Sequence, residues 1–68
     1  MTGAQFDALA ELLRMREGAS KTAARLVLVD GKSPAEAARL AGTTPQSVNS
    51  ALRSCERGAQ LARIAAGA

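Results

Sequence analysis

Apolar side chains recur at helical spacing along the first part of the chain, with polar side chains between them. The first stripe follows the i, i+3, i+4, i+7 pattern of an amphipathic helix. Its members are Phe6, Leu9, Ala10 and Leu13. Because Thr2 can cap this segment, the pattern predicts a first helix that reaches about Met15.

A second apolar segment runs from about Ala19 or Ser20 to Val29. Its closing LVLV run is also compatible with a short strand, because branched residues favour sheets. The sequence offers no second strand-like segment to pair with it, so we predict a helix. This helix is expected to end at Gly31, in the left-handed conformation that glycine adopts easily.

The stretch from Ser33 to Arg53 predicts two helices joined by a tight turn. A hydroxyl residue caps a helix well and proline fits its first turn, and this combination occurs twice. The two pairs are Ser33-Pro34 and Thr44-Pro45. Glu36 adds the spacing of a capping box, and Gly42 supplies the turn between the helices. This arrangement is that of a DNA-binding helix-turn-helix.

Small and apolar residues fall where the two helices of such a motif must cross. The positions that require a small or inward-facing side chain hold Ala37, Ala38 and Ala41, and those that anchor the second helix hold Val48, Ala51 and Leu52. Leu40 is expected to pack against the preceding helix. The alternative interpretation is an antiparallel helical hairpin that packs without contacting DNA.

The last helix is predicted to begin at Pro45, and it either ends at Gly58 or bends there and continues to Ala65. An apolar face on its distal part comprises Leu61, Ile64, Ala65 and Ala68. We predict that a two-fold interface uses Leu52, Leu61, Ile64 and Ala65; the alternative is a frayed alanine-rich tail. The fold class is therefore all-α, a small helix-turn-helix bundle of four to five helices. Residues 1–68 form one domain, with 58–68 as a helical dimerisation tail.

The composition favours association. The chain has 68 residues and a single aromatic side chain, Phe6, so its core must be thin. Small domains of this kind often rely on a disulfide, a metal or a second subunit. Cys55 is the only cysteine and there is no histidine, which excludes an internal disulfide and a zinc site. A homodimer is the remaining means of stabilisation. Cys55 itself is expected to be a half-buried packing group, with a redox role as the alternative.

Positive charge is concentrated in the second half of the chain. The net charge is +3. Up to residue 38 basic and acidic side chains balance, whereas beyond it four arginines face Glu56 alone. The arginines are Arg39, Arg53, Arg57 and Arg63. This excess suggests a polyanionic partner, although an ordinary solvated basic surface is the alternative.

The outward face of the segment 45–57 is polar, as a recognition helix requires. We predict that base-reading residues are Thr44, Gln46, Ser47, Asn49, Ser50 and Arg53. Amide side chains suit adenine, and Arg53 can reach a guanine edge or a phosphate. We predict phosphate contacts for Lys32, Ser33, Thr43 and Arg57. Thr44 is at the same time a natural helix cap.

The segment AARLVLVDGKSPAEAARLAGTTPQSVNSALRSCER resembles the DNA-binding domain of the TrfB/KorA-type transcriptional repressors of broad-host-range plasmids. The similarity is carried by Ala24, Arg25 and the VLVDGK run Val27 to Lys32, followed by Ala38, Leu40, Gly42, Thr44, Val48 and Ala51. It extends over about Thr2 to Arg57. The resemblance implies a helical domain that binds a palindromic operator as a dimer and shuts off plasmid promoters.

We therefore expect a sequence-specific DNA-binding transcriptional repressor, a homodimer that binds palindromic double-stranded operator DNA with a recognition helix at 45–57 and controls plasmid genes. The alternative is a small helical protein-interaction module, antitoxin-like or adaptor, without specific DNA binding. The sequence predicts no enzyme, because no nucleophile has a visible base. It predicts no cofactor, metal, small-molecule ligand or membrane span. A bacterial cytoplasmic location, associated with nucleoid or plasmid, is expected.

Overall fold

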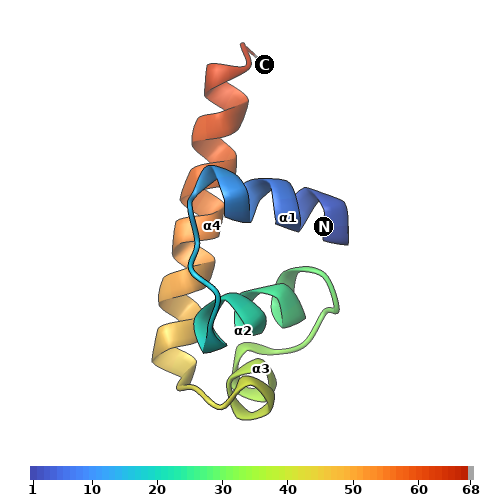
Figure 1. Ribbon diagram of the computed structural model, residues 1–68, viewed down its shortest axis with the longest axis vertical. Coiled ribbons are helices and arrows are strands. Elements are labelled where there is room, and N and C mark those ends of the chain that lie inside the picture. Colours follow the sequence, from blue (N-terminus) through green and yellow to red (C-terminus); the bar gives the residue numbers. More distant parts are fainter. Residues whose placement is uncertain (68) are drawn as a thin grey trace.

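Four α-helices make up the part of the chain that the computed structural model describes, residues 1–67. They are α1 (Gly3–Leu12), α2 (Ala19–Leu28), α3 (Pro34–Ala41) and α4 (Pro45–Ala65). The long helix α4 runs the length of the molecule, α1 crosses it, and α2 and α3 lie beside its N-terminal half (Figure 1). The all-α prediction is confirmed with four helices, and the last helix is continuous through Gly58 to Ala65.

Hydroxyl caps begin three of the helices, as the sequence predicts. Thr2 and Gln5 form a complete capping box at α1, in which each side chain accepts a hydrogen bond from the other residue's backbone N–H. At α3, the Ser33 hydroxyl accepts from the Glu36 N–H at 3.2 Å. The Glu36 carboxylate instead faces Lys32 and does not complete the box. At α4, Thr44 caps in the same way as Ser33.

The first helix ends three residues earlier than predicted. Leu12 is its last residue, and Arg14 adopts a left-handed conformation with φ 54°. The Met15 N–H then donates to the Ala10 carbonyl at 2.9 Å, which closes a Schellman motif. The prediction of a helix to about Met15 was wrong because arginine occupies the left-handed position, where glycine would have signalled the end. This turn directs Met15 back against the core.

Two hydrophobic clusters form the core, and α2 contributes to both. The first, which we call the α1 core, comprises Phe6, Leu9, Ala10, Ala24 and Cys55. The second, the corner core, comprises Ala23, Ala37, Ala38 and Val48. Leu52 is partly buried and packs against both clusters. The adjacent residues Ala23 and Ala24 thus tie the helix-turn-helix corner to α1.

Cys55 is more deeply buried than the sequence suggests. It is almost fully enclosed in the α1 core, where its Sγ lies 3.9 Å from the Sδ of Met15. Burial raises the pKa of the Cys55 thiol above its ordinary value, so the thiol stays protonated at neutral pH. A protonated, enclosed thiol is a packing group and a poor nucleophile.

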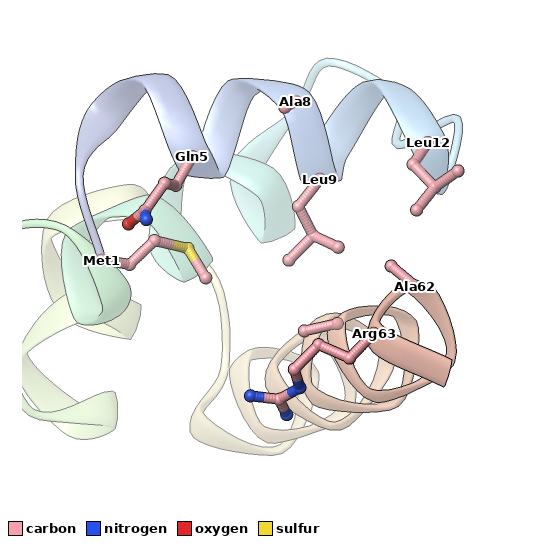
Figure 2. A pocket seen from close by; sticks show the side chains of 8 residues that line it. Met1, Gln5, Ala8, Leu9, Leu12, Ala62 and Arg63 are labelled. Atoms are coloured by element: carbon pink, nitrogen blue, oxygen red, sulfur yellow. The ribbon is translucent and has the colours of Figure 1, made fainter. Parts of the chain in front are cut away.

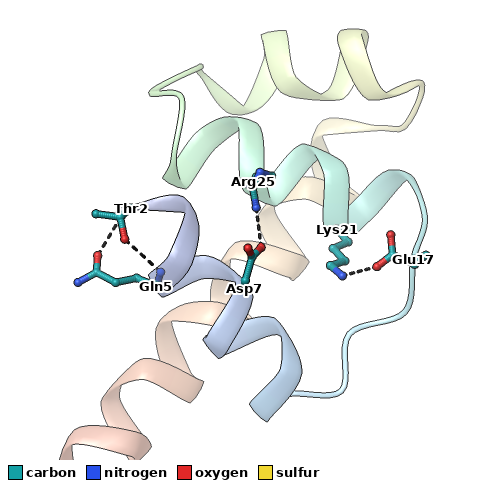
Figure 3. A network of polar contacts seen from close by, with 6 residues as sticks. All are labelled: Thr2, Gln5, Asp7, Glu17, Lys21 and Arg25. Atoms are coloured by element: carbon teal, nitrogen blue, oxygen red, sulfur yellow. Dashed lines mark hydrogen bonds and ion pairs between the residues drawn. The ribbon is translucent and has the colours of Figure 1, made fainter.

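Polar contacts fix the position of α1 against α2 (Figure 3). The Asp7 carboxylate accepts a hydrogen bond from the Arg25 guanidinium at 2.7 Å. The same guanidinium lies over the Phe6 ring, 5.7 Å from its centre. A second ion pair is local to the start of α2, where Lys21 in the first turn pairs with Glu17 just before the helix. These pairs are exposed, so we expect them to orient the helices more than to stabilise them.

Gly58 lies where the C-terminal end of α1 packs closely against α4. A Cβ at this buried position would lie 2.6 Å from Leu13 Cδ2 and 3.0 Å from its Cγ. We therefore expect Gly58→Val to lower the free energy of unfolding by about 1–3 kcal/mol in urea denaturation. Gln60→Val, an exposed position on the same helix, is the control for placing valine in a helix. Equal stability of the two variants would contradict the close crossing.

Candidate nucleic-acid interface

The corner between α3 and α4 has the geometry that a helix-turn-helix needs. Gly42 ends α3 in the left-handed conformation, with φ 73° and ψ 37°. The N–H groups of Gly42 and Thr43 both donate to the Ala38 carbonyl, which turns the chain sharply. Thr44 then begins α4 at once. A three-residue connection, 42–44, therefore joins the two helices.

The corner core confirms most of the predicted packing positions. Ala37, Ala38 and Val48 are buried, and Ala41 and Ala51 are partly buried. Side chains this small let α3 pack closely against both α2 and α4. The inward side of α4 is therefore fixed, and so is the side that faces outward.

The prediction that Leu40 packs against the preceding helix was wrong. Its side chain is 54% exposed. The buried side of α3 is filled by Ala37, Ala38 and Ala41, and Leu40 lies roughly 100° around the helix from their centre. Close approach of the alanines leaves no gap on the buried side that would admit a leucine.

Four of the predicted base-reading residues share the exposed side of α4. Gln46, Asn49, Ser50 and Arg53 are all exposed. They recur every three or four residues, so they form one stripe along the first half of the helix. We call this stripe the reading face. Val48 and Cys55, on the opposite side of the same helix, are buried.

The other two predicted readers are engaged at the helix cap. The Thr44 hydroxyl accepts from the Ser47 N–H at 3.1 Å and donates to the Ser47 hydroxyl oxygen at 3.0 Å. Both hydrogen-bonding directions of Thr44 are therefore used within the cap. Ser47 is partly buried, and its hydroxyl can still donate outward. Thr44 thus acts as a cap, as the sequence also suggested.

The basic side chains differ in how far they are neutralised. Arg53 and Arg57 make no ion pair with any residue in the described range 1–67. Lys32 and Arg39 both lie near the Glu36 carboxylate, at 3.8 Å and 3.9 Å. Arg57 follows Arg53 by one helical turn, so the two guanidinium groups extend the reading face with uncompensated positive charge.

The predicted phosphate-contacting residues fall into two groups. Thr43 and Arg57 flank the reading face, in the turn before α4 and on α4 itself. Lys32 and Ser33 precede α3, which separates them from Thr44 by a helix of about 12 Å. The Ser33 hydroxyl oxygen accepts the capping hydrogen bond of α3. Arg39, on the last turn of α3, is 72% exposed; it belongs to the basic excess noted in the sequence, which predicts no phosphate contact for it.

The predicted dimerisation residues are also divided by the structure. Leu52 packs against both core clusters within the same chain, which leaves little of it for a partner. Leu61, Ile64 and Ala65 are exposed on the distal part of α4. Ala68, which the sequence placed with them, lies outside the described residues. Leu12 of α1, for which the sequence predicts no role, is 61% exposed beside this region.

Shallow apolar grooves lie on two sides of the α1–α4 crossing. The larger, about 530 Å³, has Met1, Leu9 and Leu12 on one wall and Ala62 and Arg63 on the other (Figure 2). The smaller, about 280 Å³, is lined by Leu12, Leu13, Gly58, Leu61, Ala62 and Ala65. Leu12 and Ala62 border both grooves. Apart from Leu40 on α3, the large exposed apolar side chains of α3 and α4, together with Leu12, therefore gather at the end of the molecule away from the corner.

Other kinds of site find little support in the described residues. No three of their His, Cys, Asp or Glu side chains gather closely enough to hold a metal ion. None of the four helices described is both long enough and apolar enough to cross a membrane. The polar groove that is lined by Asp7, Glu17, Lys21 and Arg25 holds ion pairs between its own side chains. The reading face is thus the most distinctive polar surface of the chain.

The resemblance to TrfB/KorA-type repressors stays a prediction from the motif residues. The first of those residues, Ala24 to Lys32, lie on α2 and in the loop that follows it, and the others lie at the corner, where Ala38 and Val48 are buried and Gly42 makes the turn. Comparison of the chain with protein-family models, curated proteins and solved structures gives no match.

Proposed function

We propose that this protein is a sequence-specific DNA-binding transcriptional repressor, in which the first half of α4 enters the major groove of an operator. A homodimer would place one reading face in each half-site of a palindrome, about one helical turn or roughly 34 Å apart. Repression follows when the bound dimer occupies a promoter. The motif resemblance adds plasmid promoters as the proposed targets.

One observation carries this proposal: α4 has a buried side that anchors it in the corner and an opposite side where arginines with no ion pair among residues 1–67 lie between amide and hydroxyl groups. Gln46 and Asn49 each offer a donor and an acceptor, which matches the major-groove edge of adenine. Arg53 can reach guanine or a phosphate. Short side chains such as Ser50 allow the helix to approach the floor of the groove.

The charge distribution also supports DNA bound along the exposed side of α4. Phosphates attract Arg57 on α4 and the backbone amides at the start of this helix, where the helix dipole is positive. Lys32 and Arg39 add charge near α3, reduced by their shared contact with Glu36. We therefore expect the affinity for any duplex to fall with increasing salt.

We expect Arg53→Ala and Gln46→Ala each to weaken binding to the preferred site by about 5- to 150-fold, while binding to random duplex changes much less. The preferred site is first recovered by selecting bound sequences from a random DNA pool. Fluorescence anisotropy then gives both affinities. Lys32→Ala should weaken binding to the preferred site and to random duplex by the same factor. It should also reduce the slope of log affinity against log salt concentration by about one.

Arg16→Ala is the matched control, because Arg16 is exposed, lies in the α1–α2 connection and carries the same charge as Arg53. It should lose much less site-selective binding than Arg53→Ala. Equal losses on the selected and random duplexes for Arg53→Ala and Gln46→Ala would contradict base reading by α4.

The exposed apolar grooves favour a second candidate, a protein-interaction module without specific DNA binding. Such a module would bind through the α1–α4 crossing and would leave the polar side of α4 free in solution. The DNA selection separates the candidates, because a pure interaction module would enrich no sequence.

A further inference from the structure

The smaller apolar groove is a hollow with a ridge beside it. Its floor holds Leu13, Gly58 and Ala62, and its rim holds Leu12, Leu61 and Ala65. Leu12 is 61% exposed and Leu61 is 47% exposed, so the rim presents two large apolar side chains to solvent. Gly58 and the Leu13 side chain packed against it place the hollow at the α1–α4 crossing. A surface that carries both a ridge and a hollow can pack against a copy of itself.

The groove lies on the flank of α4, about a quarter turn away from the reading face. At 3.6 residues per turn, Leu61 lies about 60° and Ala65 about 100° around the axis from Gln46. Ile64 lies in line with Gln46, because eighteen residues make about five turns. A partner seated in the groove would therefore leave the reading face uncovered, whereas one seated on Ile64 would lie on the same side as DNA.

We propose that this groove is a two-fold interface occupied by a second copy of the chain, with Leu12 and Leu61 at its centre. This inference rests on the proposed function, and it assigns the partner that a palindromic site requires. A two-fold axis parallel to the outward direction of the reading face turns both reading faces toward the same side. The grooves then face each other across the axis, with the two α4 helices antiparallel.

Charge favours this groove over the larger one. All six lining residues of the smaller groove are uncharged and apolar. The larger groove contains Arg63, and a two-fold interface there would bring two guanidinium groups together without an acidic lining residue to offset them. The chain carries a net charge of +3, so two copies repel each other wherever basic side chains meet.

The length of α4 agrees with the spacing that half-sites need. Asn49 to Leu61 is about 18 Å along the helix and Asn49 to Ala65 about 24 Å, at about 1.5 Å per residue. Antiparallel helices that meet over Leu61 to Ala65 place the two reading faces at most about 36–48 Å apart. A crossing angle between the helices shortens this distance toward the roughly 34 Å of one DNA turn.

Sedimentation velocity over a range of protein concentrations tests the interface directly. The unaltered protein should reach twice its 7.0 kDa mass, and both Leu12→Glu and Leu61→Glu should remain monomers. Ile64→Glu is the matched control: it makes the same type of change on an exposed apolar residue, three positions after Leu61 and outside the groove. It should still dimerise. Circular dichroism verifies that each variant folds.

A second measurement keeps the test independent of destabilisation. In a Cys55→Ala background, Leu61→Cys should form an intermolecular disulfide under mild oxidation, and Gln60→Cys should form much less. A monomeric unaltered protein, a dimer that survives Leu12→Glu and Leu61→Glu, or equal crosslinking at both positions would overturn the interface.

The outcome also separates this interface from the proposed function. Site-selective DNA binding by a protein that never dimerises through the groove would overturn the interface and leave base reading intact. A dimer that is broken by Leu61→Glu but enriches no DNA sequence would support the interface and overturn the repressor.

Discussion

Replacing Phe6 with alanine is expected to remove about 3–5 kcal/mol of the free energy of unfolding, a third or more of the total. Phe6 is fully buried and is the single aromatic residue of the chain, so it fills the centre of the α1 core. Truncating a buried phenylalanine costs about 3–5 kcal/mol. A chain of 68 residues has about 3–10 kcal/mol of stability in total, at about 0.05–0.15 kcal/mol per residue.

Urea denaturation followed by circular dichroism measures this loss. Leu40→Ala is the control, because Leu40 is a large apolar side chain on a helix but is mostly exposed. Its free energy of unfolding should stay within about 0.5 kcal/mol of the unaltered protein. A folded Phe6→Ala protein of nearly normal stability would mean that the α1 core does not depend on the aromatic ring.

Val48→Asp is the second change with a large expected effect. Val48 is fully buried in the corner core, between α3 and α4. An aspartate there would place an unpaired carboxylate among alanines, at a cost of about 3 kcal/mol or more. We expect loss of the cooperative unfolding transition and, with it, of DNA binding.

Asn49→Asp adds the same charge one residue later, on the exposed side of α4. It should leave the free energy of unfolding nearly unchanged while weakening DNA binding, because a carboxylate on the reading face repels phosphates. Together the two variants separate the anchoring side of α4 from its reading side. Unchanged DNA binding by Asn49→Asp would count against the proposed orientation of the helix.

The sequence predicts the helix starts and the corner well because their signals are local. A hydroxyl cap followed by proline gives the same start in any context, and Gly42 is free to turn left-handed. The end of α1 carries no such signal, since arginine has no preference for the left-handed conformation that Arg14 adopts, just before Met15 packs against the core. Such an end depends on tertiary contacts that the local sequence does not reveal.

The exposure of leucines is equally a tertiary property. Leu12 and Leu40 both belong to apolar segments, yet each lies outside the buried side of its helix. The buried side of α1 is already filled by Phe6, Leu9 and Ala10, and that of α3 by closely packed alanines, so neither leucine enters the core. For the candidate site, periodicity is enough to predict which α4 residues share the reading face. It does not predict that the Thr44 hydroxyl is hydrogen-bonded to Ser47, or that Leu52 packs against the core.

The two neighbouring alanines of α2 have a consequence for how the molecule unfolds. Ala23 contributes to one cluster and Ala24 to the other, and Leu52 spans both. Neither cluster can therefore dissolve without removing contacts from the other, and the chain is too small to hold either alone. We expect the molecule to melt as a single cooperative unit. A destabilising substitution in the α1 core should therefore unfold the distant corner as completely as a substitution within the corner core.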